Sequence, residues 1–150
     1  MIWHKETLIS LGGFDVELGI KGYKLSVGEE TMAFRRLWET HDKPNVLYDP
    51  ALIVFHWVPD FKMKVSYYLK RAFIAGQVAI RLDSISGIRW RIRTAVRSFG
   101  AGTMYFFRAV LRFTHYRHWQ NWCVEECLPI ATKLGTTLAI FGITMNARQK

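Results

Sequence analysis

Two adjacent carboxylates and one imidazole are the side chains of this sequence best suited to chemistry. Glu29 and Glu30 follow Gly28 and open a helix-like segment, and His56 ends an apolar run. A carboxylate within hydrogen-bond reach of a hydroxyl is the usual base that removes its proton. A neutral imidazole can ligate a divalent metal, and it suits Mn²⁺ better than Mg²⁺. These side chains predict a site that deprotonates a hydroxyl, provided that the fold brings them together.

Each candidate also has a purely structural interpretation. Two glutamates in the first turn of a helix complement its dipole, and Glu29 and Glu30 taken alone favour that role. A single histidine after an apolar strand is more often a satisfied core residue than a ligand. His56 gains interest from its place at a strand end, where sites lie in open α/β sheets. Asp15, beside a glycine pair, is of a type that stabilises turns.

Hydrophobic periodicity predicts the elements that must position these residues. A short helix near the N-terminus ends at Gly12 and Gly13, where glycine adopts the left-handed cap. Residues 19–28 predict a loop, since glycines alternate there with lysines and a tyrosine. The other predicted elements are helices over residues 29–39 and 62–82 and, within an extended segment at 45–58, a buried strand at 51–55.

Composition limits the class of protein. The chain has 150 residues, half of them apolar, which is enough for a hydrophobic core and unlike a disordered protein. Its net charge of +9 is unevenly placed. Residues 1–60 contain six basic and nine acidic residues, whereas residues 61–118 contain twelve basic residues and one acid. The basic part suits an anionic partner such as lipid or nucleic acid.

The basic part is also aromatic. Within residues 89–117, Arg93, Arg97, Arg108 and Arg112 fall close to one helical stripe, and tryptophan and phenylalanine cover much of the rest. Such a helix is typical of a membrane–water interface, and a solvated face over a protein core is the alternative. Glycines at positions 100 and 102 leave open whether one helix or two form here.

Residues 128–145 form an apolar stretch with a single charge, Lys133. A membrane span needs about twenty residues, so spanning, re-entrant and core-buried helices all remain open. A membrane-associated hairpin with the preceding segment is the favoured prediction. Small residues such as Gly135, and Gly76 in the helix at 62–82, would let helices approach closely.

The cysteine pattern and the N-terminus predict an ordinary reducing environment. Cys123 and Cys127 have no histidine or further cysteine at metal-ligand spacing, so free thiols are favoured over a zinc site. No charged stretch followed by an apolar core opens the chain, so no signal peptide is predicted.

Four motifs in order make the first part of the chain resemble the C-terminal half of an inverting glycosyltransferase of family 2, which has the GT-A fold. The resemblance covers about residues 4–80, including the helix that ends in Ala75-Gly76. Each motif alone is weak, and their order and spacing carry the resemblance. The motifs are Gly12-Gly13-Phe14-Asp15, Gly28-Glu29-Glu30, an arginine at Arg35 or Arg36, and Tyr48–His56.

The resemblance implies sugar transfer from a nucleotide-sugar donor to a carbohydrate or lipid-linked acceptor, as in polysaccharide or glycolipid synthesis. It places Glu30 as the base and Glu29 beside it to orient the acceptor, although the family more often has Asp at the position of Glu30. It also implies that Asp15 and Arg35 bind the acceptor. His56 would lie near a divalent metal, Mn²⁺ or Mg²⁺.

The family's Asp-x-Asp metal site and nucleotide-binding half do not occur in these 150 residues. The resemblance therefore predicts a fragment that does not transfer sugar alone and that self-associates through exposed apolar surface. The expected location is the cytoplasmic face of a membrane, with the C-terminal helices either on the membrane surface or within the membrane.

The predicted fold class is α/β. A partial GT-A-like domain with few strands is expected over residues 1–82, followed by basic amphipathic and apolar helices that associate with a membrane over 83–150. The alternative is a basic scaffold at a membrane interface without catalysis. Nucleic-acid binding is disfavoured, because the arginines lie among bulky apolar residues and no recognised binding motif is present.

Overall fold

The computed structural model describes residues 2–19, 22, 25–82 and 87–144, and this part of the chain is helical without any strand or sheet. The predicted α/β class is therefore wrong. The main helices are α1 (Lys5–Ser10), α2 (Glu29–Thr40), α3 (Val65–Leu82), α4 (Ile88–Leu111) and α6 (Leu128–Ile140). Shorter turns of helix are η1 (Asp60–Met63), η2 (Phe113–His115), α5 (Trp119–Trp122) and the π-helix η3 (Cys123–Cys127).

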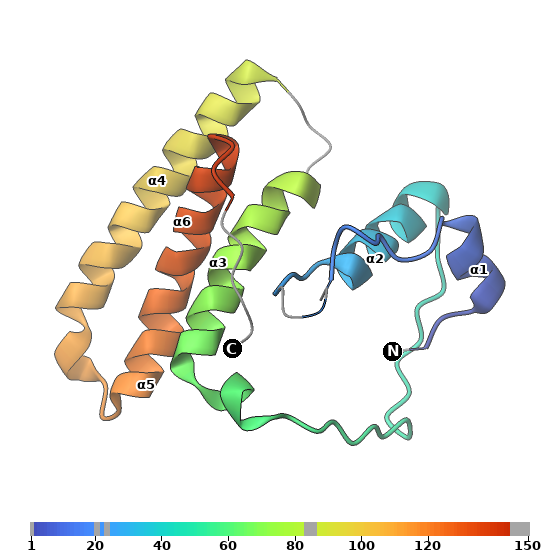
Figure 1. The fold of residues 1–150 in the computed structure, drawn as a ribbon, viewed down its shortest axis with the longest axis horizontal. Coiled ribbons are helices and arrows are strands. Elements are labelled where there is room, and N and C mark those ends of the chain that lie inside the picture. Colours follow the sequence, from blue (N-terminus) through green and yellow to red (C-terminus); the bar gives the residue numbers. More distant parts are fainter. Residues whose placement is uncertain (1, 20–21, 23–24, 83–86, 145–150) are drawn as a thin grey trace.

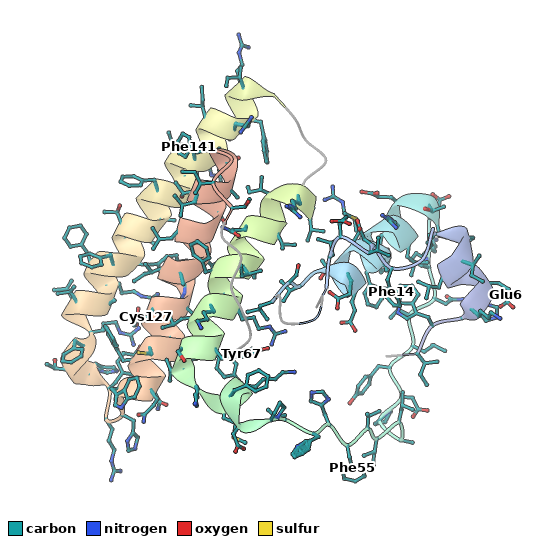
Figure 2. All side chains as sticks on the ribbon, viewed as in Figure 1. Glu6, Phe14, Phe55, Tyr67, Cys127 and Phe141 are labelled. Atoms are coloured by element: carbon teal, nitrogen blue, oxygen red, sulfur yellow. The ribbon has the colours of Figure 1, made fainter. Side chains whose placement is uncertain are left out.

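The segment predicted as a strand is the clearest difference. Residues 45–58 are irregular, and their apolar side chains face outward, with Leu47 92% and Phe55 96% exposed. Figure 2 shows Phe55 at the outer edge of this segment. A strand is stable only when its backbone groups pair with a neighbouring strand, and the described residues supply none. The β-branched and aromatic residues of this segment favour an extended backbone, but no neighbouring strand is available among the described residues to pair with it.

Three helices pack side by side in the C-terminal part. Helix α6 lies between α3 and α4 (Figure 1) and contacts both. Helix α3 lies within residues 1–82, the part predicted as a catalytic domain. It nevertheless packs along α6, which lies within residues 83–150, the part predicted as separate membrane-associated helices. Helix α4 is unbroken through Gly100 and Gly102, which decides the alternative that the sequence left open.

Two glycines set the distance between α3 and α6. A Cβ atom at Gly76 would overlap the carbonyl oxygen of Thr132, and one at Gly135 would overlap that of Phe73. The buried Thr136 adds a hydrogen bond of 3.1 Å from Oγ1 to the carbonyl oxygen of Gly76. The close approach predicted from small residues is confirmed at both positions, and the partner of Gly135 is α3 rather than the preceding segment.

A buried carboxylate ties α4 to the start of the last helical run. Glu126 lies in the π-helix η3 and is fully buried. It accepts hydrogen bonds from Arg108, Arg112 and Tyr116 at 2.6, 2.9 and 2.7 Å. The indole of Trp122 also donates to a carbonyl oxygen of α4, that of Ala109, at 2.8 Å. These bonds determine which face of α4 turns inward.

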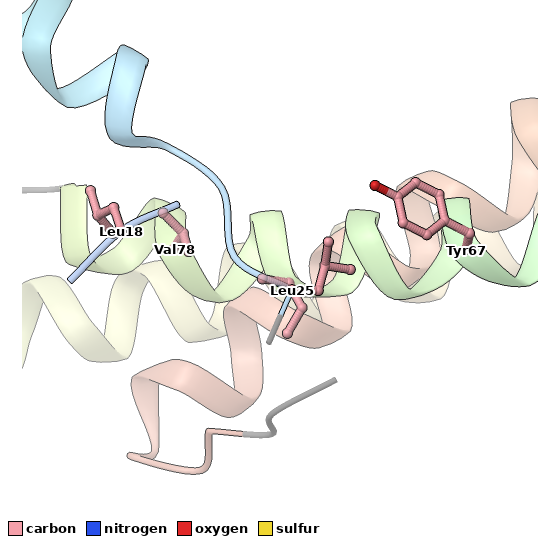
Figure 3. Packing of buried hydrophobic residues seen from close by; sticks show 5 residues of the cluster. Leu18, Leu25, Tyr67 and Val78 are labelled. Atoms are coloured by element: carbon pink, nitrogen blue, oxygen red, sulfur yellow. The ribbon is translucent and has the colours of Figure 1, made fainter. Parts of the chain in front are cut away.

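The N-terminal part packs on the other side of α3 (Figure 1). The loop that precedes α2 contributes leucines to a small core on α3 (Figure 3). Predicted helices over 29–39 and 62–82 are confirmed with small shifts of their ends, because η1 precedes α3 as a separate turn. The core consists of Leu18, Leu25, Tyr67, Ile74 and Val78.

Within the described part of the chain, no helix combines the length and the apolar character needed to cross a membrane. The apolar stretch predicted at 128–145 is helical only over Leu128–Ile140, and Met145 lies outside the described residues.

Candidate functional site

Glu29, Glu30 and His56 line one hollow between the start of α2 and the side of α3. Its volume is about 570 Å³. Binding sites for small ligands span roughly 300–1,000 Å³, so the hollow has room for one or two sugar rings. We call it the α2–α3 hollow; its lining is Leu25–Thr31, His56, Val58, Lys62, Tyr67, Tyr68, Arg71, Ala75, Val78, Ala79 and Leu82.

Gly28 brings the two carboxylates to this place. It precedes α2 with a φ of 106°, a left-handed conformation that side chains rarely adopt. A Cβ atom at this position would lie 2.8 Å from Cγ1 of Val78 on α3. Glycine therefore lets the first turn of α2, with Glu29 and Glu30, come close to α3.

The two glutamates differ in their surroundings. Glu29 is half-buried and lies against Gly19, where a Cβ atom would be 2.9 Å from the carboxyl carbon Cδ of Glu29. Glu30 is exposed. Both side chains also line a second, smaller hollow of about 490 Å³, together with Phe14, Asp15, Val16, Leu18 and Gly19. The pair thus stands between two hollows, with Glu30 the more accessible carboxylate.

Asp15 holds its own turn as well as lining the smaller hollow. Its Oδ1 accepts a hydrogen bond of 2.8 Å from the backbone N–H of Glu17. Its Oδ2 lies 3.7 Å from Nη2 of Arg36, whose Nη1 donates to the carbonyl oxygens of Leu11 and Gly13 at 3.3 Å. Arg36 therefore fastens the glycine turn to α2, and Asp15 takes part in that fastening.

Arg35 lies away from both hollows. Its Nε donates to Oε1 of Glu39 at 2.8 Å, one turn further along α2, and its Nη1 donates to the carbonyl oxygen of Leu82. The structure thus uses Arg35 to join α2 to the end of α3, and it does not bring this side chain to the α2–α3 hollow with Glu29 and Glu30.

His56 reaches the α2–α3 hollow from the irregular segment, where it is exposed. The described residues contain no group of three or more His, Cys, Asp or Glu side chains placed to hold a metal ion. This set of described residues therefore supplies no such cluster for the implied Mn²⁺ or Mg²⁺.

Sequence reasoning missed the opposite wall of the hollow, which carries Lys62, Tyr67, Tyr68 and Arg71. The spacing of the last three residues places them on one side of α3, and this helical period was the available signal. Tyr67 is buried, and its ring packs edge-on to that of Phe61 at a centroid distance of 5.8 Å. The wall thus offers two cations and two phenol rings opposite the carboxylates.

No match to this chain was found among protein-family models, curated proteins or solved structures.

Proposed function

We propose that the α2–α3 hollow is the acceptor side of a sugar-transfer site, with Glu30 as the general base. One observation supports this most strongly: a hollow of about 570 Å³ is lined by Glu29 and Glu30 from the start of α2 and by His56 from a separate segment. Two of the motifs that resemble family 2 glycosyltransferases, Gly28-Glu29-Glu30 and Tyr48–His56, contribute residues to this lining.

In the proposed reaction, the acceptor hydroxyl attacks the anomeric carbon of a nucleotide-sugar. A bond forms between the acceptor oxygen and that carbon while the bond from the carbon to the diphosphate oxygen breaks. The hydroxyl proton passes to the carboxylate of Glu30, which is exposed and can meet the acceptor directly. Glu29, held against Gly19, accepts a hydrogen bond from a second hydroxyl and orients the acceptor.

The other wall of the α2–α3 hollow can complete recognition. Tyr68 is 41% exposed and offers a phenol ring and hydroxyl to the ligand. Lys62 and Arg71 supply positive charge for an anionic group, such as the phosphate of a lipid-linked acceptor. A neutral or phosphate-bearing carbohydrate is therefore the proposed ligand class.

Binding of carbohydrate to the isotope-labelled chain tests this proposal. We expect oligosaccharides from a chemically varied panel to shift the amide resonances of Glu29, Glu30 and Tyr68 in a saturable way. The E29Q/E30Q variant should weaken that binding about tenfold or more, because a charge-assisted hydrogen bond is lost. D42N is the matched control, since Asp42 is an exposed carboxylate beyond α2 and outside the hollow.

Two results would overturn the proposal. One is the absence of carbohydrate binding across the panel, and the other is binding whose resonance shifts map away from the α2–α3 hollow. If turnover of a nucleotide-sugar is observed with a bound acceptor, E30Q should reduce kcat by about 10²–10⁴-fold, the usual contribution of a general base.

A further inference from the structure

The outer face of α4 carries an exposed apolar stripe. Its members recur every three, four or seven residues, which aligns them along one side of the helix. Each of them is more than half exposed, and Figure 2 shows side chains projecting from α4 on the side away from α6. With a rise of 1.5 Å per residue, the helix is about 36 Å long. The stripe consists of Ile88, Ile92, Val96, Phe99, Phe106 and Val110.

Contacts on the opposite face fix this orientation. Ala95, Ser98 and Ala109 are buried on α4, which contacts both α6 and η3. Arg91 donates to the carbonyl oxygen of Ile140, and Arg108 donates to the buried Glu126. Rotating α4 to hide the stripe would break these bonds. The apolar exposure is therefore a fixed property of the fold.

A row of arginines borders the stripe. Arg89, Arg93 and Arg97 each follow a stripe residue by one position, and all three are exposed. Residues 88–111 contain no aspartate or glutamate. The outer face of α4 is thus apolar along its length and cationic along one edge of its first half. Arg108 and Arg112, which the sequence grouped with this row, are instead bound to Glu126.

We propose that the outer face of α4 lies in the plane of a membrane that contains anionic lipid. The apolar stripe would enter the boundary between head groups and acyl chains, roughly 5–10 Å deep, and the arginine row would bind lipid phosphates. This inference is independent of the proposed sugar transfer, because none of its residues lines the α2–α3 hollow.

Charge complementarity selects this occupant over two others. A second copy of the chain would double the arginines at the interface, while α4 supplies no carboxylate to neutralise them. A nucleic acid would contact the arginine row and leave the phenylalanines of the stripe in water. A membrane with anionic head groups satisfies the apolar and the cationic parts of the face together.

Vesicle co-sedimentation of the full chain tests the inference, with phosphatidylcholine vesicles compared with vesicles that also contain phosphatidylglycerol. We expect strong retention on the mixed vesicles, weaker retention on phosphatidylcholine alone, and a decrease with added salt. The R89Q/R93Q/R97Q variant should bind mixed vesicles about a hundredfold more weakly. The F99S/F106S variant should lose retention on both kinds of vesicle.

The control variant K64Q/R81Q/R117Q removes the same net charge from exposed positions on other segments. It should retain most of the binding, and all variants should keep the native circular dichroism spectrum, because the changed side chains are exposed. Equal losses in the two triple variants would overturn the inference, since they would show a response to net charge alone. So would the absence of vesicle binding, including the case of a lipid-free dimer that F99S/F106S abolishes.

Discussion

Arg108 donates a hydrogen bond of 2.6 Å from Nε to Oε2 of Glu126, a carboxylate with no exposed side-chain surface. Arg112 and Tyr116 satisfy its other oxygen at 2.9 and 2.7 Å. A buried charge is costly unless its hydrogen-bonding capacity is met, and here three donors meet it. The cluster fixes the rotation of α4, and through it the face that α4 presents outward.

Removing the charge of Glu126 should destabilise the fold. We expect E126Q to lower the free energy of unfolding by about 1–3 kcal/mol, because charge-assisted hydrogen bonds are lost while the two arginines can regain water. Urea unfolding measures this. Glu125 is the control, since it is adjacent and exposed and its carboxylate accepts only a surface hydrogen bond of 3.0 Å from the Tyr116 hydroxyl. E125Q should change stability by less than about 0.5 kcal/mol. Equal effects of the two variants would contradict the assignment.

The same carboxylate should make stability depend on acid pH. Burial alone would raise the pKa of Glu126, but the hydrogen bonds from Tyr116 and Arg108 and the charges of the two arginines lower its pKa below the ordinary value. A lowered pKa in the folded state means that the stabilisation is complete above the unfolded-state pKa and is lost as pH falls through the folded-state pKa.

The expected outcome is a decline in the urea midpoint of the wild type below the ordinary glutamate range. E126Q should show a shallower decline, because it lacks this titrating group. Parallel pH profiles for the two proteins would show that Glu126 does not contribute.

The contact between α3 and α6 should tolerate no side chain at its glycines. G135A places a methyl group on the carbonyl oxygen of Phe73, so the helices must separate, at a cost of about 3 kcal/mol. G100A is the matched control, because Gly100 lies within α4 and a Cβ atom at this position would meet open space. That variant should be neutral or stabilised by up to about 1 kcal/mol. Thermal unfolding of both variants decides the matter, and equal shifts in Tm would argue against the close contact.

Gly28 should matter for ligand binding beyond its effect on stability. G28A places a side chain at a φ of 106° and 2.8 Å from Cγ1 of Val78, so the first turn of α2 must move away from α3. We expect about tenfold weaker carbohydrate binding in the α2–α3 hollow. G13A is the control, since Gly13 also has a positive φ, 71°, but has open space around it. Both variants should lose roughly 1–2 kcal/mol to backbone strain, and only G28A should lose affinity.

Cys127 should react slowly with alkylating reagents. Burial raises the pKa of its thiol to about 11, and the neighbouring Cys123 contributes in the same direction. Because the thiolate is the reactive form, the native rate with iodoacetamide near neutral pH should be lower than the unfolded rate, on the order of a hundredfold. Mass spectrometry of the alkylated peptides measures each cysteine separately. Similar rates in native and unfolded protein would contradict the raised pKa.

Local sequence patterns predicted what depends on near neighbours in the chain. The helices at 29–39 and 62–82 followed from their period, and Gly12 and Gly13 do adopt positive φ after the first helix. The position of Glu29 and Glu30 in the first turn of a helix was likewise predicted correctly, because the turn itself places these side chains. These features depend on interactions between residues a few positions apart, and the sequence determines such interactions directly.

Only the tertiary structure decided features that need a distant partner. The apolar run at 51–55 has strand-forming residues, but strand formation depends on a neighbouring strand that the described residues do not provide. The helical period grouped Arg108 and Arg112 with an exposed basic stripe, but in the structure both donate hydrogen bonds to Glu126 of another helix. The wall that faces Glu29 and Glu30 likewise comes from α3. It lies close to them because Gly28 lets the start of α2 pack against Val78. Hydrogen bonds and packing between segments distant in the sequence determine these features, and no local hydrophobic period predicts such contacts.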